Sequence, residues 1–88
     1  MNRKFYEVEV IQAGDDALYL RVNGQVVQIA WIDCSASLAD ASAIEREIIE
    51  VAPSGYGLHW PLLDEDLALA PLLLHGKNVE IEMSGLVA

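Results

Sequence analysis

Cysteine is nearly absent from this sequence of 88 residues, in which Cys34 is the only one. A single cysteine excludes an intrachain disulfide and a CxxC zinc or redox motif. Long apolar runs are also absent: the longest, LALAPLLL, has eight residues, whereas a membrane-spanning helix needs about 20. Glu7 and Glu9 interrupt the N-terminal segment, which therefore lacks the apolar core of a signal peptide. We expect a cytoplasmic protein that makes no contact with a membrane.

Basic residues are scarce as well. Five Lys and Arg stand against 14 Asp and Glu, which gives a formal net charge of −9. The imbalance is steepest in residues 34–88, which hold two basic and nine acidic residues. Proteins bind nucleic acids largely by replacing counterions along the phosphates with Lys and Arg. This composition therefore argues against direct binding of DNA or RNA and favours a partner protein with a basic surface.

The length and the apolar content indicate one small domain that spans residues 1–88. Hydrophobic residues make up 53% of the chain, which is enough for a core. A chain of this length buries only roughly 60–65% of the surface that its unfolded form exposes. Association with a partner would add to its stability, and a homodimer is one form of such association.

The first third of the chain has the pattern of β-strands. The segments FYEVEVIQA (5–13), ALYLRV (17–22) and QVVQIAW (25–31) are rich in β-branched and aromatic residues, and the first of them alternates between its two faces. Asn23 and Gly24, between the second and third segments, are the strongest short signal for a β-hairpin. We predict three antiparallel strands, with Trp31 on the same face of the third strand as Val27 and Ile29.

The composition then changes towards Ala, Ser and Glu, which favours a helix. Ser42 followed by Glu45 fits a capping box at a helix start. The β-branched segment before Pro53 predicts a fourth strand over 48–52, and LHW predicts a fifth over 58–60. Gly55 and Gly57 are expected to take positive φ angles in the turn that joins these two strands.

The last part of the chain predicts a second short helix and a final strand. Ala70 precedes a proline and is expected to be extended, so that Pro71 opens the helix and Gly76 follows its end. The alternating segment NVEIEM (78–83) is expected to return to the edge of the sheet. The predicted fold is α+β, with two layers: a largely antiparallel sheet of five or six short strands, and one or two short helices on one face.

The least ordinary stretch is GYGLHWPLLDEDLAL (55–69), which joins glycines, aromatic residues and an acidic cluster. Leu58 and Trp60 should share one face of the fifth strand, so Trp60 belongs to the core or to an interface, while His59 is half exposed. In this position His59 can form a hydrogen bond with Asp64 or Asp66. The candidate binding residues are Tyr56, His59, Trp60, Asp64, Glu65 and Asp66.

Metal binding and catalysis have weaker support in the same stretch. His59, Asp64 and Asp66 are suitable ligand types, but the spacing of a calcium loop or a zinc site is missing, so Asp64 and Asp66 are better explained as caps of backbone N–H groups. Nucleophilic catalysis would need Cys34 to meet a histidine in space. The chain also lacks a nucleophile elbow and the GxGxxG phosphate pattern. We predict no enzyme activity, no cofactor and no resident metal.

The block GYGLHWPLLDEDLAL, placed after a hairpin strand that ends in AW and after the segment ASAIERE, resembles the bacterial domain of unknown function number 2442. The resemblance covers residues 5–74 and is carried by Gly55, Tyr56, Gly57, Leu58, His59, Trp60, Pro61, Leu63, Asp64, Glu65, Asp66, Leu67, Leu72 and Leu73. It implies a small two-layer α/β domain with no established activity. Some members of that family resemble antitoxins, and others look like regulators with a C-terminal helix-turn-helix.

This chain departs from the regulator form of the family, because only twelve residues follow Gly76 and a helix-turn-helix needs more. It also has Ala68 where the family pattern usually has Ser. The leading hypothesis is a non-catalytic protein-interaction domain, in its narrower version an antitoxin-like partner of a small basic protein encoded next door. The alternative is a domain that binds a small molecule or a metal through His59, Asp64 and Asp66.

Overall fold

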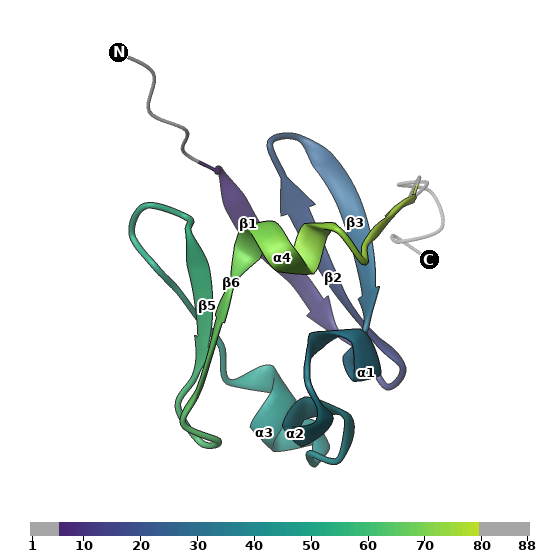
Figure 1. Cartoon of the computed structure of the whole chain (residues 1–88), viewed down its shortest axis with the longest axis vertical. Coiled ribbons are helices and arrows are strands. Elements are labelled where there is room, and N and C mark those ends of the chain that lie inside the picture. Colours follow the sequence, from purple (N-terminus) through teal and green to yellow (C-terminus); the bar gives the residue numbers. More distant parts are fainter. Residues whose placement is uncertain (1–5, 80–88) are drawn as a thin grey trace.

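The computed structural model describes residues 6–79, which form seven strands and four short helices (Figure 1). In chain order the elements are β1 (Val8–Ala13), β2 (Ala17–Val22), β3 (Gln25–Ala30), α1 (Trp31–Cys34), α2 (Ala36–Ala39), α3 (Ala43–Glu47), β4 (Glu50–Val51), β5 (Gly57–Trp60), β6 (Glu65–Ala68), α4 (Leu69–Leu73) and β7 (Lys77–Val79). The predicted α+β class is confirmed. The strands form two antiparallel sheets, however, and not one continuous sheet.

The first sheet has four strands in the order β1-β2-β3-β7. Asn23 and Gly24 connect β2 to β3 with φ angles of 50° and 88°, as a two-residue hairpin turn requires, so the predicted hairpin is confirmed. β7 pairs with β3 through Val26 and Val79, and this confirms the predicted return to the sheet edge. The rest of that predicted strand, 80–83, lies outside the described residues.

Three one-turn helices follow the hairpin. The predicted capping box is confirmed, because the Ser42 hydroxyl accepts the Glu45 N–H at 3.3 Å and the Glu45 carboxylate accepts the Ser42 N–H at 2.9 Å. Trp31 opens α1 and does not extend the third strand as predicted, because Ala30 already pairs with Ala17, the first residue of β2. The Trp31 indole N–H donates instead to the Gly14 carbonyl oxygen at 2.8 Å.

The second sheet has three strands in the order β4-β5-β6. β4 and β5 confirm the strands predicted over 48–52 and 58–60. β6 was not predicted, since acidic residues have low β propensity and were interpreted as helix caps. In the structure Asp64 takes a φ of 52° in a tight turn, and Glu65 then pairs with Trp60. Pairing with β5 therefore overrides the local preference of the acidic segment.

α4 begins at Leu69, two residues before the predicted start, and Ala70 is helical where an extended residue was expected. Pro71 is tolerated at this position, because N–H groups in the first turn of a helix have no acceptor within the helix and none is lost to the proline ring. The prediction that Pro71 opens the helix is therefore wrong by two residues, while the helix itself is present.

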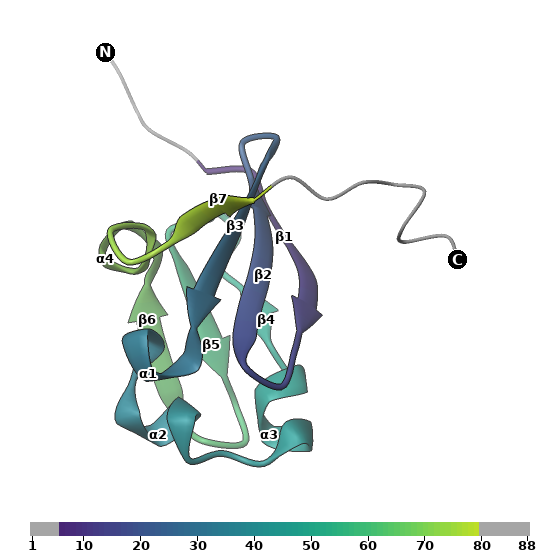
Figure 2. The ribbon, with the colours of Figure 1, turned by 90° about the vertical axis from the view of Figure 1, so that its right-hand side faces the viewer.

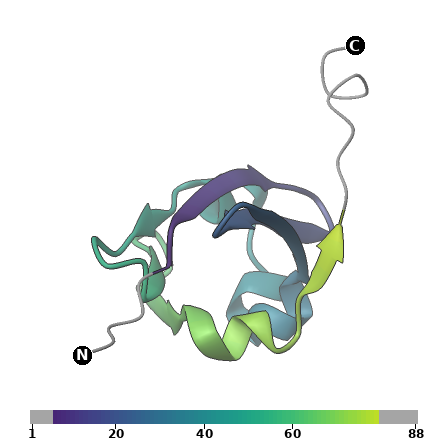
Figure 3. The same ribbon diagram turned by 90° about the horizontal axis from the view of Figure 1, so that it is seen from above.

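The core lies between the two sheets, which Figures 2 and 3 show facing each other with α4 crossing from β6 to β7. The rings of Trp31 and Trp60 meet edge to face, with centroids 6.4 Å apart. The buried apolar side chains come from strands of both sheets and from three helices: Ala17, Leu18, Leu20, Val22, Val27, Ile29, Trp31, Leu38, Leu58, Trp60, Leu69 and Leu72. Burial of these side chains holds the sheets together.

Arg46 joins the helices to the first hairpin. Its guanidinium donates to the carbonyl oxygens of Leu38 at 2.9 Å, Ala39 at 2.8 Å and Asp15 at 3.1 Å, and it lies over the Trp31 ring at 5.1 Å from the centroid. One of the few basic residues of the chain thus has a structural task.

Within residues 6–79 no helix has the length and apolarity needed to cross a membrane.

Candidate functional site

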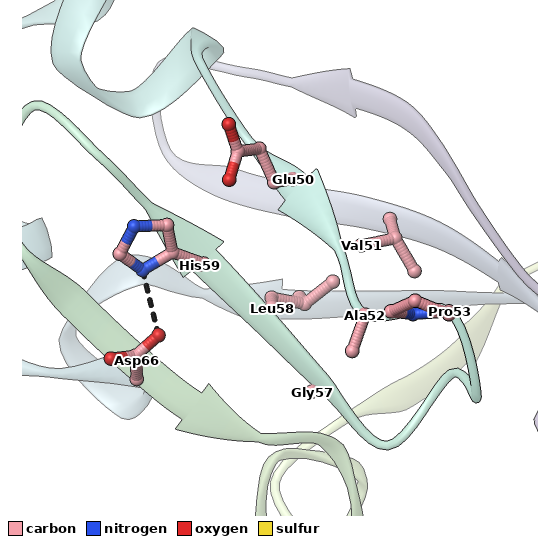
Figure 4. Close-up of a pocket in the computed structure, with 8 residues that line it drawn as sticks. All are labelled: Glu50, Val51, Ala52, Pro53, Gly57, Leu58, His59 and Asp66. Carbon is pink, nitrogen blue, oxygen red and sulfur yellow. Dashed lines mark hydrogen bonds and ion pairs between the residues drawn. The ribbon is translucent and has the colours of Figure 1, made fainter.

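The outer face of the three-stranded sheet carries a row of three polar side chains. Glu50 on β4 pairs with His59 on β5, and His59 pairs with Asp66 on β6. Directly paired residues project to the same side of a sheet, so the three side chains lie next to one another (Figure 4). Leu58 and Trp60 project to the opposite side, into the core, as the alternation of the segment predicted.

His59 and Asp66 are in direct contact within this row. His59 Nδ1 lies 2.6 Å from Asp66 Oδ1, and their side chains are 32% and 78% exposed. An ionised carboxylate only accepts hydrogen bonds, so Nδ1 of His59 is the donor. The predicted hydrogen bond of His59 to a nearby aspartate is thereby confirmed, with Asp66 as the acceptor. The bond orients the ring, and most of the Asp66 side chain remains exposed.

A hollow of about 260 Å³ adjoins the row. Figure 4 shows the residues that line it. Its lining combines the three polar residues with small and apolar ones: Glu50, Val51, Ala52, Pro53, Gly57, Leu58, His59 and Asp66. Glycine is required at position 57 for a steric reason, because a Cβ there would lie 2.9 Å from the Leu67 carbonyl oxygen of β6. The missing side chain lets β6 approach and keeps the surface concave beside His59.

The turn that leads into β5 depends on Gly55. This residue has a φ of 76°, as predicted, and a side chain here would overlap the carbonyl group of Tyr6. Gly57, for which a positive φ was also predicted, does not have one and is a regular residue of β5. The correction follows from chain geometry: the turn is completed before Gly57, whose carbonyl oxygen already accepts the Ala52 N–H at 3.0 Å.

The six residues predicted as a binding site do not form one surface. His59 and Asp66 lie together on the outer face, whereas Trp60 is 0% exposed and donates its indole N–H to the Arg46 carbonyl oxygen at 3.2 Å. Glu65 pairs with Trp60 and therefore projects from the other side of the sheet. Tyr56 is exposed in the turn before β5, and Asp64 is exposed in the turn before β6. Of the two places considered for Trp60, the structure assigns the core.

Glu50 is the site residue that the sequence analysis did not identify. A usable signal was present, since strands over 48–52 and 58–60 joined by a short turn must pair with each other and bring an acidic residue beside His59. The exact partner could not be derived, because it depends on how many residues form the turn. Four residues, 53–56, do so, and this sets Glu50 opposite His59.

Cys34 and the histidine of the site lie in different environments. Cys34 is half-buried on α1 and packs against the core, whereas His59 lies on the outer face of β5. Burial, and to a smaller extent the charge of Asp33, raises the pKa of the Cys34 thiol to about 12. A thiol with this pKa is a poor nucleophile at neutral pH.

Among residues 6–79, no group of three His, Cys, Asp or Glu side chains is placed to hold a metal ion.

Comparison with known proteins identifies a family. The model of a family described as "Protein of unknown function (DUF2442)" matches residues 8–85 of the 88. This match agrees with the resemblance noted in residues 5–74. The searches of curated proteins and of solved structures found no match.

Proposed function

The chain belongs to the DUF2442 family of proteins of unknown function, and we propose that it is a non-catalytic protein-interaction domain that binds a basic segment of a partner protein. The binding surface is the outer face of β4, β5 and β6, with Glu50, His59 and Asp66 at its centre. The partner is a small basic protein. In the narrower version of the proposal this partner is a toxin encoded next door, and the chain is its antitoxin.

The row of Glu50, His59 and Asp66 is the observation that supports this proposal. Two carboxylates flank an imidazole on an exposed sheet face, in a chain whose formal net charge is −9. An Arg or Lys head group placed here gains charge-assisted hydrogen bonds from the carboxylates. Its aliphatic stem fits the hollow formed by Ala52 and Pro53, since long basic side chains commonly lay their methylenes on apolar surface.

The composition of the hollow supports a binding role in preference to a catalytic one. A His–Asp pair becomes part of a hydrolytic site when a nucleophile lies within hydrogen-bond reach of the imidazole. The lining residues of the hollow include no Ser, Thr, Cys or Lys, and the Cys34 thiol packs against the core. We therefore interpret the pair as part of a binding site for a positively charged group, in which the imidazole holds the Asp66 carboxylate in place.

The test begins with affinity purification of the tagged chain from its own host, followed by mass spectrometry. We expect a small basic protein in stoichiometric amount. The captured partner is then titrated against the Asp66→Asn and Asp64→Asn variants, each of which removes one negative charge. Asp66→Asn should raise Kd about tenfold, and Asp64→Asn should change it less than twofold, since Asp64 lies outside the hollow.

Two results would contradict the proposal. The first is recovery of the chain without any stoichiometric partner. The second is an equal effect of the two variants, which would mean that only the overall charge matters and that the outer face is not the binding surface. Titration at two salt concentrations adds a further check, because a contact between exposed charges weakens as salt is raised.

The second candidate function is binding of a small cationic molecule or a divalent ion in the same hollow. Its volume of about 260 Å³ lies just below the usual range of ligand pockets, and His59 and Asp66 provide polar groups on its wall. Asp64, the third residue considered for this role, is not part of the lining. A panel of divalent ions and small amines in a thermal-shift assay tests this candidate, which requires that at least one compound raises Tm.

A further inference from the structure

The free edge of β6 lies directly beside the row of Glu50, His59 and Asp66. We propose that the partner binds as an added β-strand along this edge, in an extended conformation, with a Lys or Arg side chain next to Asp66. This inference rests on the proposed function and makes it more specific, because it names the conformation and the side-chain pattern of the bound segment. Strand addition at a sheet edge is a general mode of peptide recognition.

The direction of the backbone groups of β6 follows from its ladder with β5. The Leu69 N–H donates to the Tyr56 carbonyl oxygen at 2.8 Å, so this pair is a hydrogen-bonded one. Hydrogen-bonded and non-hydrogen-bonded pairs alternate along an antiparallel ladder. The pairs of Leu58 with Leu67 and of Trp60 with Glu65 are therefore hydrogen-bonded as well. The intervening residues of β6, Asp66 and Ala68, point their backbone N–H groups away from β5.

These outward groups are available for a new strand. β6 is the last strand of its sheet, and neither Asp66 nor Ala68 takes part in the turn, loop and cap hydrogen bonds found within residues 6–79. The Ala68 carbonyl oxygen, at the N-cap of α4, faces the first turn of that helix. The Asp66 N–H, the Asp66 carbonyl oxygen and the Ala68 N–H thus form a donor–acceptor–donor series along an exposed edge, with both residues exposed.

The other three edges offer less. β4 is an edge strand of only two residues, and β1 packs against α3 along part of its length. β7 is an edge strand of three residues, and a neighbouring hollow lined by Tyr6, Asn23 and Asn78, among others, has no charged side chain. β1 is longer and carries Glu9, but this carboxylate is already paired with Arg21. Among the described strands, β6 therefore combines four residues with an edge that no described strand pairs and with the acidic side chain of the row.

The pattern of the added strand follows from the two faces of β6. Its residue opposite Asp66 lies on the outer face, where it continues the row of Glu50, His59 and Asp66, so a Lys or Arg fits there. One neighbour of that residue in the partner lies on the other face opposite half-buried Leu67, so an apolar side chain fits there, whereas the other neighbour lies opposite Glu65. The recognised segment therefore carries a basic residue opposite Asp66 and an apolar residue opposite Leu67.

A single substitution separates edge pairing from binding through charge alone. Ala68→Pro removes the outward N–H, and the native φ of −73° is one that proline adopts. Ala68→Val is the matched control, since it keeps the N–H and adds a side chain with as many carbon atoms as that of proline. Circular dichroism and Tm of both variants check that the sheet is retained.

The probe is a short synthetic peptide in which lysine alternates with valine, with a peptide of alternating glutamate and valine as its control. We expect Ala68→Pro to weaken binding of the lysine peptide about tenfold relative to Ala68→Val. In the unmodified chain the peptide should slow hydrogen exchange of the Asp66 and Ala68 amides about tenfold or more, and this readout does not depend on the folding of any variant.

The outcomes distinguish the edge inference from the proposed function. Equal binding by the two Ala68 variants, together with unchanged exchange of both amides, would overturn strand addition. If Asp66→Asn still weakens the peptide complex in that case, the outer face remains the binding surface and only the edge inference fails. If Asp66→Asn has no effect either, the proposed function fails with it.

Discussion

His59 on β5 and Asp66 on β6 are direct cross-strand neighbours, and Nδ1 of His59 donates a hydrogen bond of 2.6 Å to Oδ1 of Asp66. The bond joins a half-exposed imidazole to a carboxylate that is 78% exposed. Exposed pairs of this kind add little to folding stability. Their main consequence is orientation, because the bond holds both side chains on the outer face beside the hollow.

The first prediction concerns the tautomer of His59. With Asp66 present, the neutral ring carries its proton on Nδ1, whereas Asp66→Ala should move it to Nε2, because the partner of one ring nitrogen decides which of them is protonated. Nitrogen chemical shifts of the imidazole report this directly. The free energy of unfolding should fall by less than about 1 kcal/mol. A ring already protonated on Nε2 in the unmodified neutral chain would contradict the hydrogen bond.

Trp60 gives a second prediction, on stability. Its ring is fully buried against Trp31, so Trp60→Ala should lower the free energy of unfolding by about 3–5 kcal/mol in urea denaturation. Tyr56→Ala, in the exposed turn nearby, should change it by less than about 0.5 kcal/mol. Similar losses for the two variants would mean that Trp60 is not a core residue. Tyr56 is therefore the aromatic residue of this segment whose removal leaves the fold intact for binding studies.

The third prediction compares two glycines with positive φ. Gly55→Ala should destabilise by roughly 3 kcal/mol, because the new methyl group meets the Tyr6 carbonyl in addition to the cost of the left-handed conformation. Gly24→Ala has the same conformational cost and no atom within 4 Å of the added carbon, so about 1 kcal/mol is expected. Thermal unfolding of both variants measures the difference. Equal losses would show that Tyr6 does not press on this turn.

Arg46 provides the fourth prediction. Arg46→Lys keeps the charge but cannot reach three carbonyl oxygens with one ammonium group, so a loss of about 1.5–3 kcal/mol is expected. The matched control is Arg21→Lys, because the contact of Arg21 among residues 6–79 is an exposed ion pair with Glu9 at 2.7 Å, and the loss should be less than about 0.5 kcal/mol. A loss at Arg46 as small as that at Arg21 would argue against its bridging role.

The fifth prediction uses the Cys34 thiol, whose pKa is raised from 9.0 to about 12 by burial and by Asp33. The unfolded chain releases this proton near pH 9, while the folded chain keeps it up to a higher pH. The contribution of the thiol to the free energy of unfolding is therefore fully present below pH 9 and is lost as the pH rises towards 12. Cys34→Ser removes this component of the alkaline pH dependence. At pH 8 the folded thiol should react with a disulfide reagent much more slowly than an unperturbed one, because a far smaller fraction of it is thiolate. Equal rates before and after addition of urea would contradict the burial of the thiol.

Much of the chain is determined by sequence features that act over a few residues. Asn23 and Gly24 tolerate positive φ and therefore specify the hairpin of β2 and β3. The Ser42 and Glu45 side chains satisfy each other's backbone N–H groups and therefore mark the start of α3. The alternation of Leu58, His59 and Trp60 decides which side chains face the core. The scarcity of Lys and Arg makes the chain acidic overall.

The tertiary structure decided the features that depend on pairing between segments. The acidic residues of β6 have a weak local preference for a strand. β6 forms because β5 supplies hydrogen-bonding partners for its backbone. Glu50 becomes a neighbour of His59 only through the register of β4 on β5. Gly57 is required by the approach of Leu67, not by a turn. Local side-chain chemistry cannot encode these distances, because ladder register and the packing of the two sheets are set by contacts between distant parts of the chain.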